Sequence, residues 1–158
     1  MKALITGGTK GLGLATARRL AQGKGEAHLF LSYRSDQAAA EAVAAEFSRV
    51  GTRCEVIACD LSEEGATDRL FDTVAAKTST LDVYIHNAAA TAFKDLGELK
   101  AHHIDKTLNI TVKSFILGCQ RATQLMPSGG AIVSISGMDT KKAVPRHGLL
   151  GAAKAALE

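Results

Sequence analysis

The stretch Thr6-Gly7-Gly8-Thr9-Lys10-Gly11-Leu12-Gly13 lies between a short apolar run and a helical pattern. Gly7 can form a tight turn, Gly11 allows the backbone to approach a ligand closely, and Gly13 lets the helix pack on the strand. The free N–H groups and the dipole at the start of that helix favour an anion, such as the pyrophosphate of a dinucleotide. A glycine-rich turn without a ligand has the same composition, but the strand before it and the helix after it favour the ligand site. We therefore predict a dinucleotide-binding loop at residues 6–13.

Five short apolar runs, bounded mostly by Gly, Asp, Asn or Ser, alternate with longer helical patterns. Continuous apolar runs are typical of strands buried on both faces of a parallel sheet, whereas half-exposed strands alternate strictly. The strand–helix alternation predicts right-handed βαβ units with helices on both faces of the sheet. The predicted fold class is therefore α/β: a three-layered, doubly wound parallel sheet with strand order 3-2-1-4-5, as one domain over residues 1–158. The predicted strands contain residues 3–5, 28–31, 54–58, 83–85 and 131–135.

The helical patterns between these runs carry their own start and stop signals. Ser35 is expected to cap the second helix, with Asp36 in its first turn and Gly51 after its end. Ser62, which two acidic residues follow, is expected to start the third helix by the same chemistry. The other helical patterns cover residues 12–22, about 98–126, and 148–158.

The end of the second apolar run indicates which dinucleotide the loop prefers. NAD sites usually place an acidic residue there, which accepts hydrogen bonds from the ribose hydroxyls. Here the run ends in Ser32-Tyr33-Arg34-Ser35, and Lys10 lies in the glycine loop beside it. Arg34 and Lys10 can both pair with a 2′-phosphate, whereas Asp36 lies two residues further on and has a role at the helix start. The predicted cofactor is therefore NADP(H).

Composition and charge exclude several classes of protein. The 158 residues are 46% apolar, 22% charged and 4% aromatic, which is typical of a globular domain and not of a disordered chain, collagen or a coiled coil. The net charge of +3 is spread along the chain and gives little basis for a nucleic-acid surface. No apolar run approaches the roughly 20 residues of a membrane helix. The first glycine, Gly7, also comes too early for a secretory signal.

The cysteines indicate the compartment. No C-x-x-C pair occurs among the three cysteines, Cys54, Cys59 and Cys119. An odd number of cysteines is typical of a protein in the reducing cytosol. The protein is therefore expected in the cytoplasm, with no nucleic-acid, membrane or metal partner.

Five ordered motifs resemble the short-chain dehydrogenase/reductase superfamily. Its glycine pattern T-G-x-x-x-G-x-G is met by residues 6–13, and its Asp-Leu pair, which contacts adenine, matches Asp60-Leu61. The family's N-N-A-G appears as His86-Asn87-Ala88-Ala89, so that its first and last positions differ. The mid-helix asparagine matches Asn109, and the lysine that binds the nicotinamide ribose matches Lys154. The resemblance implies a Rossmann-type fold and an NADP(H)-dependent oxidoreductase.

Two departures lie where the family carries its catalytic serine and tyrosine. The serine position, seventeen residues before the lysine, is Gly137, and the tyrosine position, four before the lysine, is Leu150. A subset resembling enoyl-(acyl-carrier-protein) reductases places the tyrosine seven residues before the lysine, which is His147 here. The runs around residues 132–137 and 151–158 are most similar to that subset.

The resemblance also implies roles for these positions. In the family, tyrosine exchanges a proton with the substrate oxygen, lysine lowers the pKa of that tyrosine, serine holds the oxygen, and asparagine supports a water relay. Leu150 cannot transfer a proton, whereas His147 can, because the unperturbed pKa of histidine is about 6.5. We therefore expect Asn109, Lys154 and His147 to be catalytic and to line one cleft with Gly137 at the carboxyl ends of the strands. A loop histidine without a catalytic role stays an open alternative for His147.

Two functions are compatible with this pattern. The first is reduction of a carbonyl or enoyl-thioester substrate, a small molecule or a carrier-protein-bound thioester, with a non-standard proton relay. The second is a nucleotide-binding subunit, regulator or non-redox enzyme of the same fold, which would explain the absent serine and tyrosine. Three other histidines, His86, His102 and His103, are expected at the surface. The expected cofactor-binding residues are Gly7, Thr9, Lys10, Gly11, Leu12, Gly13, Arg34, Ser35, Asp60, Leu61, Asn87, Ala88, Ala89 and Lys154.

Similar proteins continue with two more strands and a substrate-covering segment. The chain is therefore expected to be truncated or incompletely represented at its C-terminus, with the fifth strand as an open edge. A partner chain that completes the sheet is the alternative. The pattern at residues 98–126 carries more apolar surface than one sheet face needs, which, with the two-fold interfaces of the family, predicts a homodimer or homotetramer.

Overall fold

A computed structural model describes residues 1–23 and 25–158. Its strands are β1 (Lys2–Ile5), β2 (His28–Tyr33), β3 (Arg53–Ala58), β4 (Val83–His86) and β5 (Ala131–Ser134). These described strands form one parallel sheet in the order β3-β2-β1-β4-β5, with β3 and β5 at its edges. The sequence prediction of the order is confirmed, and each predicted strand end differs from the observed one by at most two residues.

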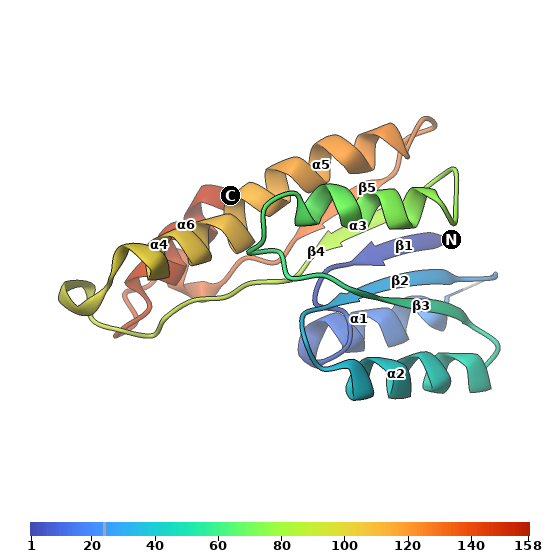
Figure 1. The fold of residues 1–158 in the computed structure, drawn as a ribbon, viewed down its shortest axis with the longest axis horizontal. Coiled ribbons are helices and arrows are strands. Elements are labelled where there is room, and N and C mark those ends of the chain that lie inside the picture. Colours follow the sequence, from blue (N-terminus) through green and yellow to red (C-terminus); the bar gives the residue numbers. More distant parts are fainter. Residues whose placement is uncertain (24) are drawn as a thin grey trace.

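Helices cover both faces of the sheet, which completes the predicted three layers (Figure 1). One face carries α1 (Gly11–Ala21) and α2 (Gln37–Arg49), and the other carries α3 (Ala66–Ala75) and α5 (Ser114–Gln124). Two further helices, α4 (Ala101–Leu108) and α6 (Gly148–Leu157), pack against each other beyond the carboxyl ends of the strands.

Alternate side chains of the central strands divide between two hydrophobic cores, because successive residues of a strand point to opposite faces. Leu4 and Phe30 belong to the core under α3 and α5. Ile5 and Leu29 belong to the core under α1 and α2, where Phe47 of α2 also packs. Both faces are therefore buried, which explains why the strands appear in the sequence as continuous apolar runs.

Two helices start later than the sequence predicted. Asp36, not Ser35, caps α2, since its Oδ1 accepts a hydrogen bond at 3.0 Å from the backbone N–H three residues later. The third helix, α3, begins at Ala66 instead of near Ser62. The reason is a turn in which Asp60 Oδ1 accepts hydrogen bonds from the N–H and the hydroxyl of Ser62, at 2.9 and 2.7 Å.

The helical pattern at residues 98–126 is interrupted. A 3-10 turn, η1 (Leu96–Glu98), precedes α4, and a π-helical segment, η2 (Asn109–Lys113), separates α4 from α5. The β-branched residues of η2 weaken the preference for a regular α-helix, and Ser114 Oγ donates a 2.6 Å hydrogen bond to the carbonyl of Ile110. Such π segments occur frequently at functional sites.

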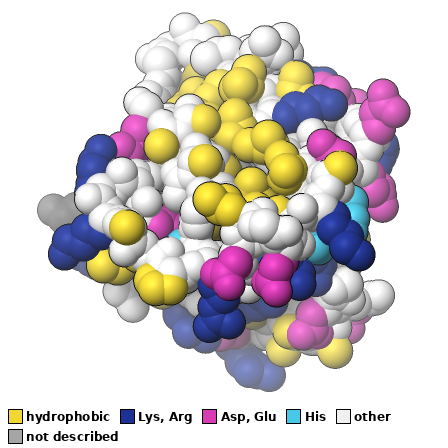
Figure 2. Space-filling model, turned by 90° about the vertical axis from the view of Figure 1, so that its left-hand side faces the viewer, with side chains coloured by type: hydrophobic (Ala, Val, Ile, Leu, Met, Phe, Trp, Pro, Cys, Tyr) yellow, Lys and Arg dark blue, Asp and Glu magenta, His cyan; other side chains and the backbone are white. Residues whose placement is uncertain are grey.

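The end of the molecule that α4 and α6 form is partly apolar. Figure 2 shows hydrophobic side chains gathered near the middle of this end face, with charged side chains around them. Exposed large hydrophobic residues include Ile104 and Leu108 of α4, and Phe93 and Leu96 in the segment before α4. None of the helices in the described part of the chain has the length and apolar character needed to cross a bilayer.

Candidate functional site

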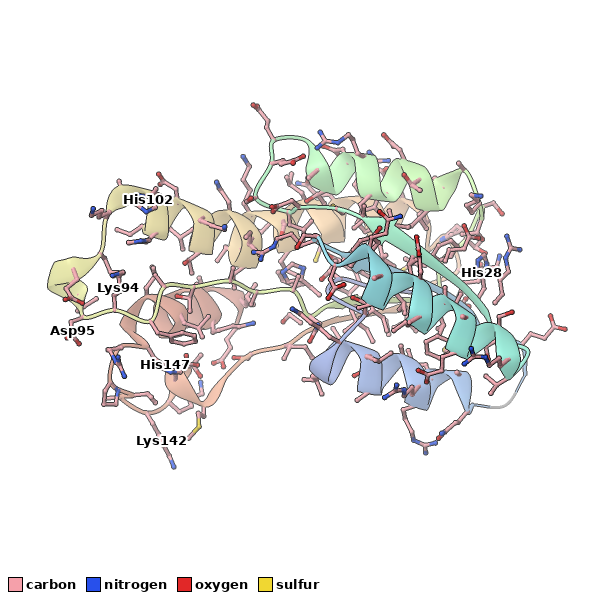
Figure 3. All side chains as sticks on the ribbon, turned by 60° about the horizontal axis from the view of Figure 1, so that its bottom comes forward. His28, Lys94, Asp95, His102, Lys142 and His147 are labelled. Carbon is pink, nitrogen blue, oxygen red and sulfur yellow. The ribbon has the colours of Figure 1, made fainter. Side chains whose placement is uncertain are left out.

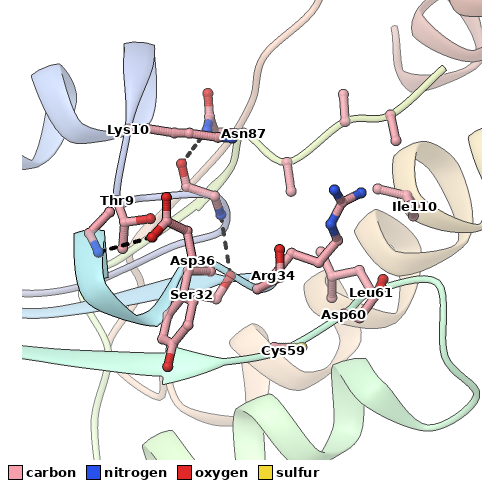
Figure 4. A pocket seen from close by; sticks show the side chains of 17 residues that line it. Thr9, Lys10, Ser32, Arg34, Asp36, Cys59, Asp60, Leu61, Asn87 and Ile110 are labelled. Atoms are coloured by element: carbon pink, nitrogen blue, oxygen red, sulfur yellow. Dashed lines mark hydrogen bonds between the residues drawn. The ribbon is translucent and has the colours of Figure 1, made fainter. Parts of the chain in front are cut away.

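A cavity of about 440 Å³ lies at the carboxyl ends of β1, β2, β3 and β4 (Figure 4). In an open α/β sheet, ligands bind at this edge, and the volume lies in the usual range for ligand sites. The predicted cofactor residues that line it are Gly7, Thr9, Lys10, Arg34, Ser35, Asp60, Leu61, Asn87, Ala88 and Ala89. The other predicted cofactor residues do not line it: Gly11, Leu12 and Gly13 form the first turn of α1, and Lys154 lies on α6.

The glycine loop forms a tight cradle that larger side chains would disrupt. Gly7 has a φ of 62°, in the left-handed region that favours glycine, and its N–H donates to Ser32 Oγ at 3.2 Å. A Cβ added to Gly13 would lie 2.3 Å from the carbonyl oxygen of Gly7, so the first turn of α1 and the loop fit closely only with glycine. At Gly11, by contrast, an added Cβ would meet no atom of the described residues within 4 Å.

Thr6 and Asn87 fasten the glycine loop to the end of β4. Thr6 Oγ1 accepts hydrogen bonds from the N–H groups of Asn87 and Ala88, at 3.1 and 3.0 Å. Asn87 Nδ2 donates to the carbonyl oxygens of Thr6 and Gly7, both at 3.0 Å. Thr6 was not among the predicted site residues, although its position at the start of the glycine pattern was a signal for it.

The charged side chains around the cavity favour an anion. Lys10 and Arg34 are exposed residues of its lining, and Figure 4 shows Arg34 extending over the cavity beside Asp60. Burial raises the pKa of Asp60, but hydrogen bonds from Ser62 and the nearby charge of Arg34 outweigh it, so that the pKa is lowered overall and the carboxylate stays ionised. The carboxylate of Asp36 is engaged in the cap of α2.

His86 is buried, so the expectation of a surface residue is wrong. Its side chain is 0% exposed and lies on the same face of β4 as Tyr84. Nε2 lies 3.2 Å from the carbonyl oxygen of Thr111, which can only accept, so Nε2 carries the hydrogen and Nδ1 accepts from the Tyr84 hydroxyl at 3.2 Å. Burial, reinforced by the charge of Lys154, lowers the pKa of His86 to about 4. His86 therefore connects β4 to η2 as a neutral imidazole. The two-residue spacing from Tyr84 was the signal that sequence reasoning missed.

Lys154 and Asn109 lie on elements that pack together, α6 and η2, and Lys154 is not part of the lining of the two hollows that Asn109 lines. Lys154 is buried, and its Nζ donates a hydrogen bond to the carbonyl of Ile135, two residues before Gly137. Burial lowers the pKa of Lys154, and the carboxylate of Asp139 opposes this change. Asn109 instead lines hollows with residues 61–67 and with Ala156.

His147 has a partner that the sequence did not reveal. Its Nδ1 lies 3.3 Å from Oδ2 of Asp139, and the two side chains are 34% and 6% exposed, respectively. The imidazole also packs on the ring of Phe93, with 4.7 Å between the ring centroids. Two other histidines, His102 and His103, lie on α4 with the first exposed and the second partly exposed.

Comparisons with known proteins agree with this architecture. A family model described as Enoyl-(Acyl carrier protein) reductase matches residues 7–158. The chain is 35% identical over 155 residues to 1-cyclohexenylcarbonyl-CoA reductase of Streptomyces collinus, a match that covers 98% of this chain and 55% of that protein. The chain spans little more than half the length of the curated relatives it matches.

Two solved structures are also similar. A short chain dehydrogenase from Burkholderia cenocepacia J2315, in complex with NADP, has a TM-score of 0.91 and 34% identity, over 98% of this chain and 63% of that one. A blue fluorescent protein from a metagenomic library, in complex with NADPH, has a TM-score of 0.92 and 29% identity, over 99% of this chain and 64% of that one.

Proposed function

This chain belongs to the short-chain dehydrogenase/reductase family, and we propose that it supports NADP(H)-dependent reduction of a carbonyl or enoyl-thioester substrate. The observation that carries the proposal is the cavity where the glycine cradle meets the basic side chains of Lys10 and Arg34. In this proposal, residues 1–158 act as one dinucleotide-binding unit.

The residues of the cavity fit an NADP(H) molecule. The cradle around Gly7 and Gly13 excludes a Cβ and leaves space for a pyrophosphate at the start of α1. Asp60 and Leu61 would hold the adenine, while Lys10 and Arg34 would pair with the 2′-phosphate. The NADP and NADPH complexes of the two similar structures support this choice of cofactor.

The chemistry divides between cofactor and chain. When bound, NADPH supplies a hydride to an electron-poor carbon of the substrate. The chain orients the two reactants, through the loop at residues 87–90 and the buried Lys154, and provides a proton for the substrate oxygen from His147. Asn109 would support the proton relay from its place at the start of η2. An enoyl thioester is favoured as substrate because the Streptomyces relative is named for an acyl-CoA with a ring double bond next to its carbonyl.

Cofactor affinity tests the proposal directly. We expect the wild-type chain to bind NADPH more tightly than NADH by roughly 10- to 100-fold, since hydrogen bonds to a charged group contribute about 1.5–3 kcal/mol. Arg34→Asp should reverse the preference, whereas Arg49→Asp, the same charge change at the end of α2, should leave it unchanged. Equal dissociation constants of the wild type for the two cofactors would contradict the proposal.

A second function has its own supporting observation. Gly137 and Leu150 occupy the positions of the family serine and tyrosine, and neither side chain can take part in proton transfer. A nucleotide-binding subunit or regulator without redox turnover would need neither residue. Oxidation of NADPH in the presence of a crotonyl thioester separates the two functions, because only the reductase consumes the cofactor.

We also propose a homodimer or homotetramer in a reducing, cytoplasmic compartment. The exposed apolar hollow between α4, η2, α5 and α6, which Leu108, Val112, Ile116 and Leu117 line together with Ala156, supports self-association. Cys54, Cys59 and Cys119 are free, which supports the reducing compartment. Sedimentation velocity measures the state of association, and a monomer at all concentrations would contradict it.

A further inference from the structure

Three ionisable side chains meet where the chain passes from β5 into α6. Asp139 lies on the 3-10 turn η3 (Met138–Thr140), His147 directly precedes α6, and Lys154 lies two turns further along that helix. His147 contacts Asp139 directly, and Lys154 lies on α6, which packs against η3. Asp139 is close enough to both to pair with His147 and to influence the pKa of Lys154.

The backbone around Asp139 is built to admit its carboxylate. A Cβ added to Gly137 would lie 2.3 Å from Asp139 Oδ1, and a Cβ added to Gly151 would lie 2.6 Å from the Asp139 carbonyl oxygen. Gly137 has an extended backbone, with a φ of −150°, which any residue can adopt. A side chain at position 137 would therefore take the space of the Asp139 carboxylate, which would have to shift, whereas the backbone conformation itself admits any residue.

A buried carboxylate is costly unless it is paired, and the partner of Asp139 is His147. Only 6% of the Asp139 side chain is exposed, whereas 34% of His147 is exposed. The carboxylate can only accept, so Nδ1 of His147 donates to it, and Nε2 at the opposite side of the ring is left for another group. Arg146, immediately before, has a φ of 62°, an uncommon conformation that turns the chain into α6.

We propose that Asp139 is the positioning residue of a proton-donating pair, Asp139–His147, which rests on the proposed reductase function. Asp139 accepts from Nδ1–H and directs Nε2–H of the imidazolium toward the substrate oxygen. Bound NADPH would supply a hydride, with its electron pair, to the electron-poor carbon of the substrate, and the π electrons would move to the oxygen. The Nε2–H bond then breaks and an O–H bond forms on the substrate. The neutral imidazole regains a proton from water through its exposed edge.

The charged groups of the surrounding elements define the electrostatics of this pair. Asp139 is the acid in contact with the imidazole, and the basic side chains of the neighbouring segments are Lys154 on α6, Lys94 after β4, and Lys141, Lys142 and Arg146 between η3 and α6. Figure 3 shows His147 at the start of α6, at the end of the molecule that also carries Lys94, Asp95 and Lys142. Asp95 makes no hydrogen bond to His147 in the described part of the chain, which makes it a matched control.

Nitrogen NMR of the histidine rings tests the pairing without any turnover. In its neutral form, wild-type His147 should carry its hydrogen on Nδ1, because the hydrogen bond to Asp139 selects this tautomer. Asp139→Ala should move the hydrogen to Nε2, which a free imidazole prefers, whereas Asp95→Ala should not. An Nε2–H tautomer in the wild type, or no change on Asp139→Ala, would overturn the proposal.

Kinetics then test the role of the pair. Asp139→Asn and His147→Gln should each slow NADPH oxidation by roughly 100-fold, the usual lower range for a general acid, without changing the dissociation constant of NADPH. The double variant should be no slower than either single one, because the two residues act as a unit. Additive losses would overturn the proposal. If the wild type has no turnover on any carbonyl or enoyl thioester, the proposed function fails, and the tautomer alone then decides whether Asp139 and His147 pair.

Discussion

The glycine loop (residues 6–13) and the connection between β5 and α6 (residues 135–147, called the corner below) both contain glycines, but for different reasons. In the loop, Gly7 has a positive φ and Gly13 touches the backbone of Gly7, so the main chain itself requires glycine. At the corner, Gly137 has an ordinary extended backbone and makes space for one side chain, that of Asp139. The loop can therefore be recognised from a local pattern, whereas the corner depends on which side chain fills the space. A glycine at the position of the family serine is thus compatible with a catalytic site built from other residues, as well as with a site that has lost its catalytic function.

The largest expected effect concerns His86, whose Nδ1 lies 3.5 Å from Thr6 Oγ1 at the start of the loop and whose pKa is influenced by the charge of Lys154 on α6. Its pKa is about 4 in the folded protein, against an ordinary value of 6.5, so folding favours the neutral imidazole. The contribution of His86 to the free energy of unfolding is fully present above pH 6.5 and is lost as the pH falls toward 4. The total loss is about 3 kcal/mol. Urea unfolding of the wild type at pH 7 and pH 4.5 measures this loss.

His86→Asn provides the control for that measurement. An asparagine does not titrate in this range, so the free energy of unfolding should fall less steeply between pH 7 and pH 4.5 than in the wild type. Parallel pH profiles of the two proteins would show that His86 is not buried as a neutral group.

Gly137→Ser should break the corner and leave the loop intact. The new Cβ would clash with Asp139 Oδ1 unless that carboxylate shifts, and we expect a loss of about 1 kcal/mol in the free energy of unfolding, the low end for overpacked sites, because the end of a side chain can move. The His147 tautomer should change with it, while NADPH affinity should not, because Gly137 does not line the cofactor cavity.

A second substitution distinguishes a clash from a general loss of stability. In the double variant Gly137→Ser with Asp139→Ala, the carboxylate is absent and most of the stability lost in Gly137→Ser should return. Thermal denaturation of the two variants measures this recovery. Equal melting temperatures of Gly137→Ser and the wild type would contradict the account of the corner.

The fold was predictable from sequence because burial on both faces of the sheet leaves continuous apolar runs, as in residues 3–5 and 28–31. The glycine loop was predictable because the local backbone geometry itself requires glycine, at Gly7 for its positive φ and at Gly13 for its close contact with Gly7. Helix starts were less predictable, since Ser62 had two roles available and a hydrogen bond to Asp60 decided between them.

The corner could not be predicted for a physical reason. The pairing of Asp139 with His147 spans eight residues without a regular element between η3 and α6, so no periodicity connects them. His86 was misjudged because it stands at the position of the family's first asparagine, after the apolar run. It is in fact the last residue of β4, and Tyr84 and Thr111 satisfy its ring nitrogens inside the core.

The smallest expected effect concerns Asp36, which lies beside the glycine loop and caps α2. Asp36 lies in the lining of the cofactor cavity, two residues after Arg34, where an acidic side chain could instead indicate NAD. Its carboxylate accepts the N–H of Ala39, so we expect Asp36→Ala to lower the free energy of unfolding by about 1 kcal/mol, the usual cost of losing an N-cap. Ser35→Ala, one residue earlier, should change the stability much less. Because the carboxylate serves the helix, Asp36→Ala should leave the preference for NADPH over NADH in place, and urea unfolding with paired cofactor titrations measures both effects. A strong change in that preference, with unchanged stability, would mean that Asp36 faces the ribose and that the charge balance of the cavity differs from the one described above.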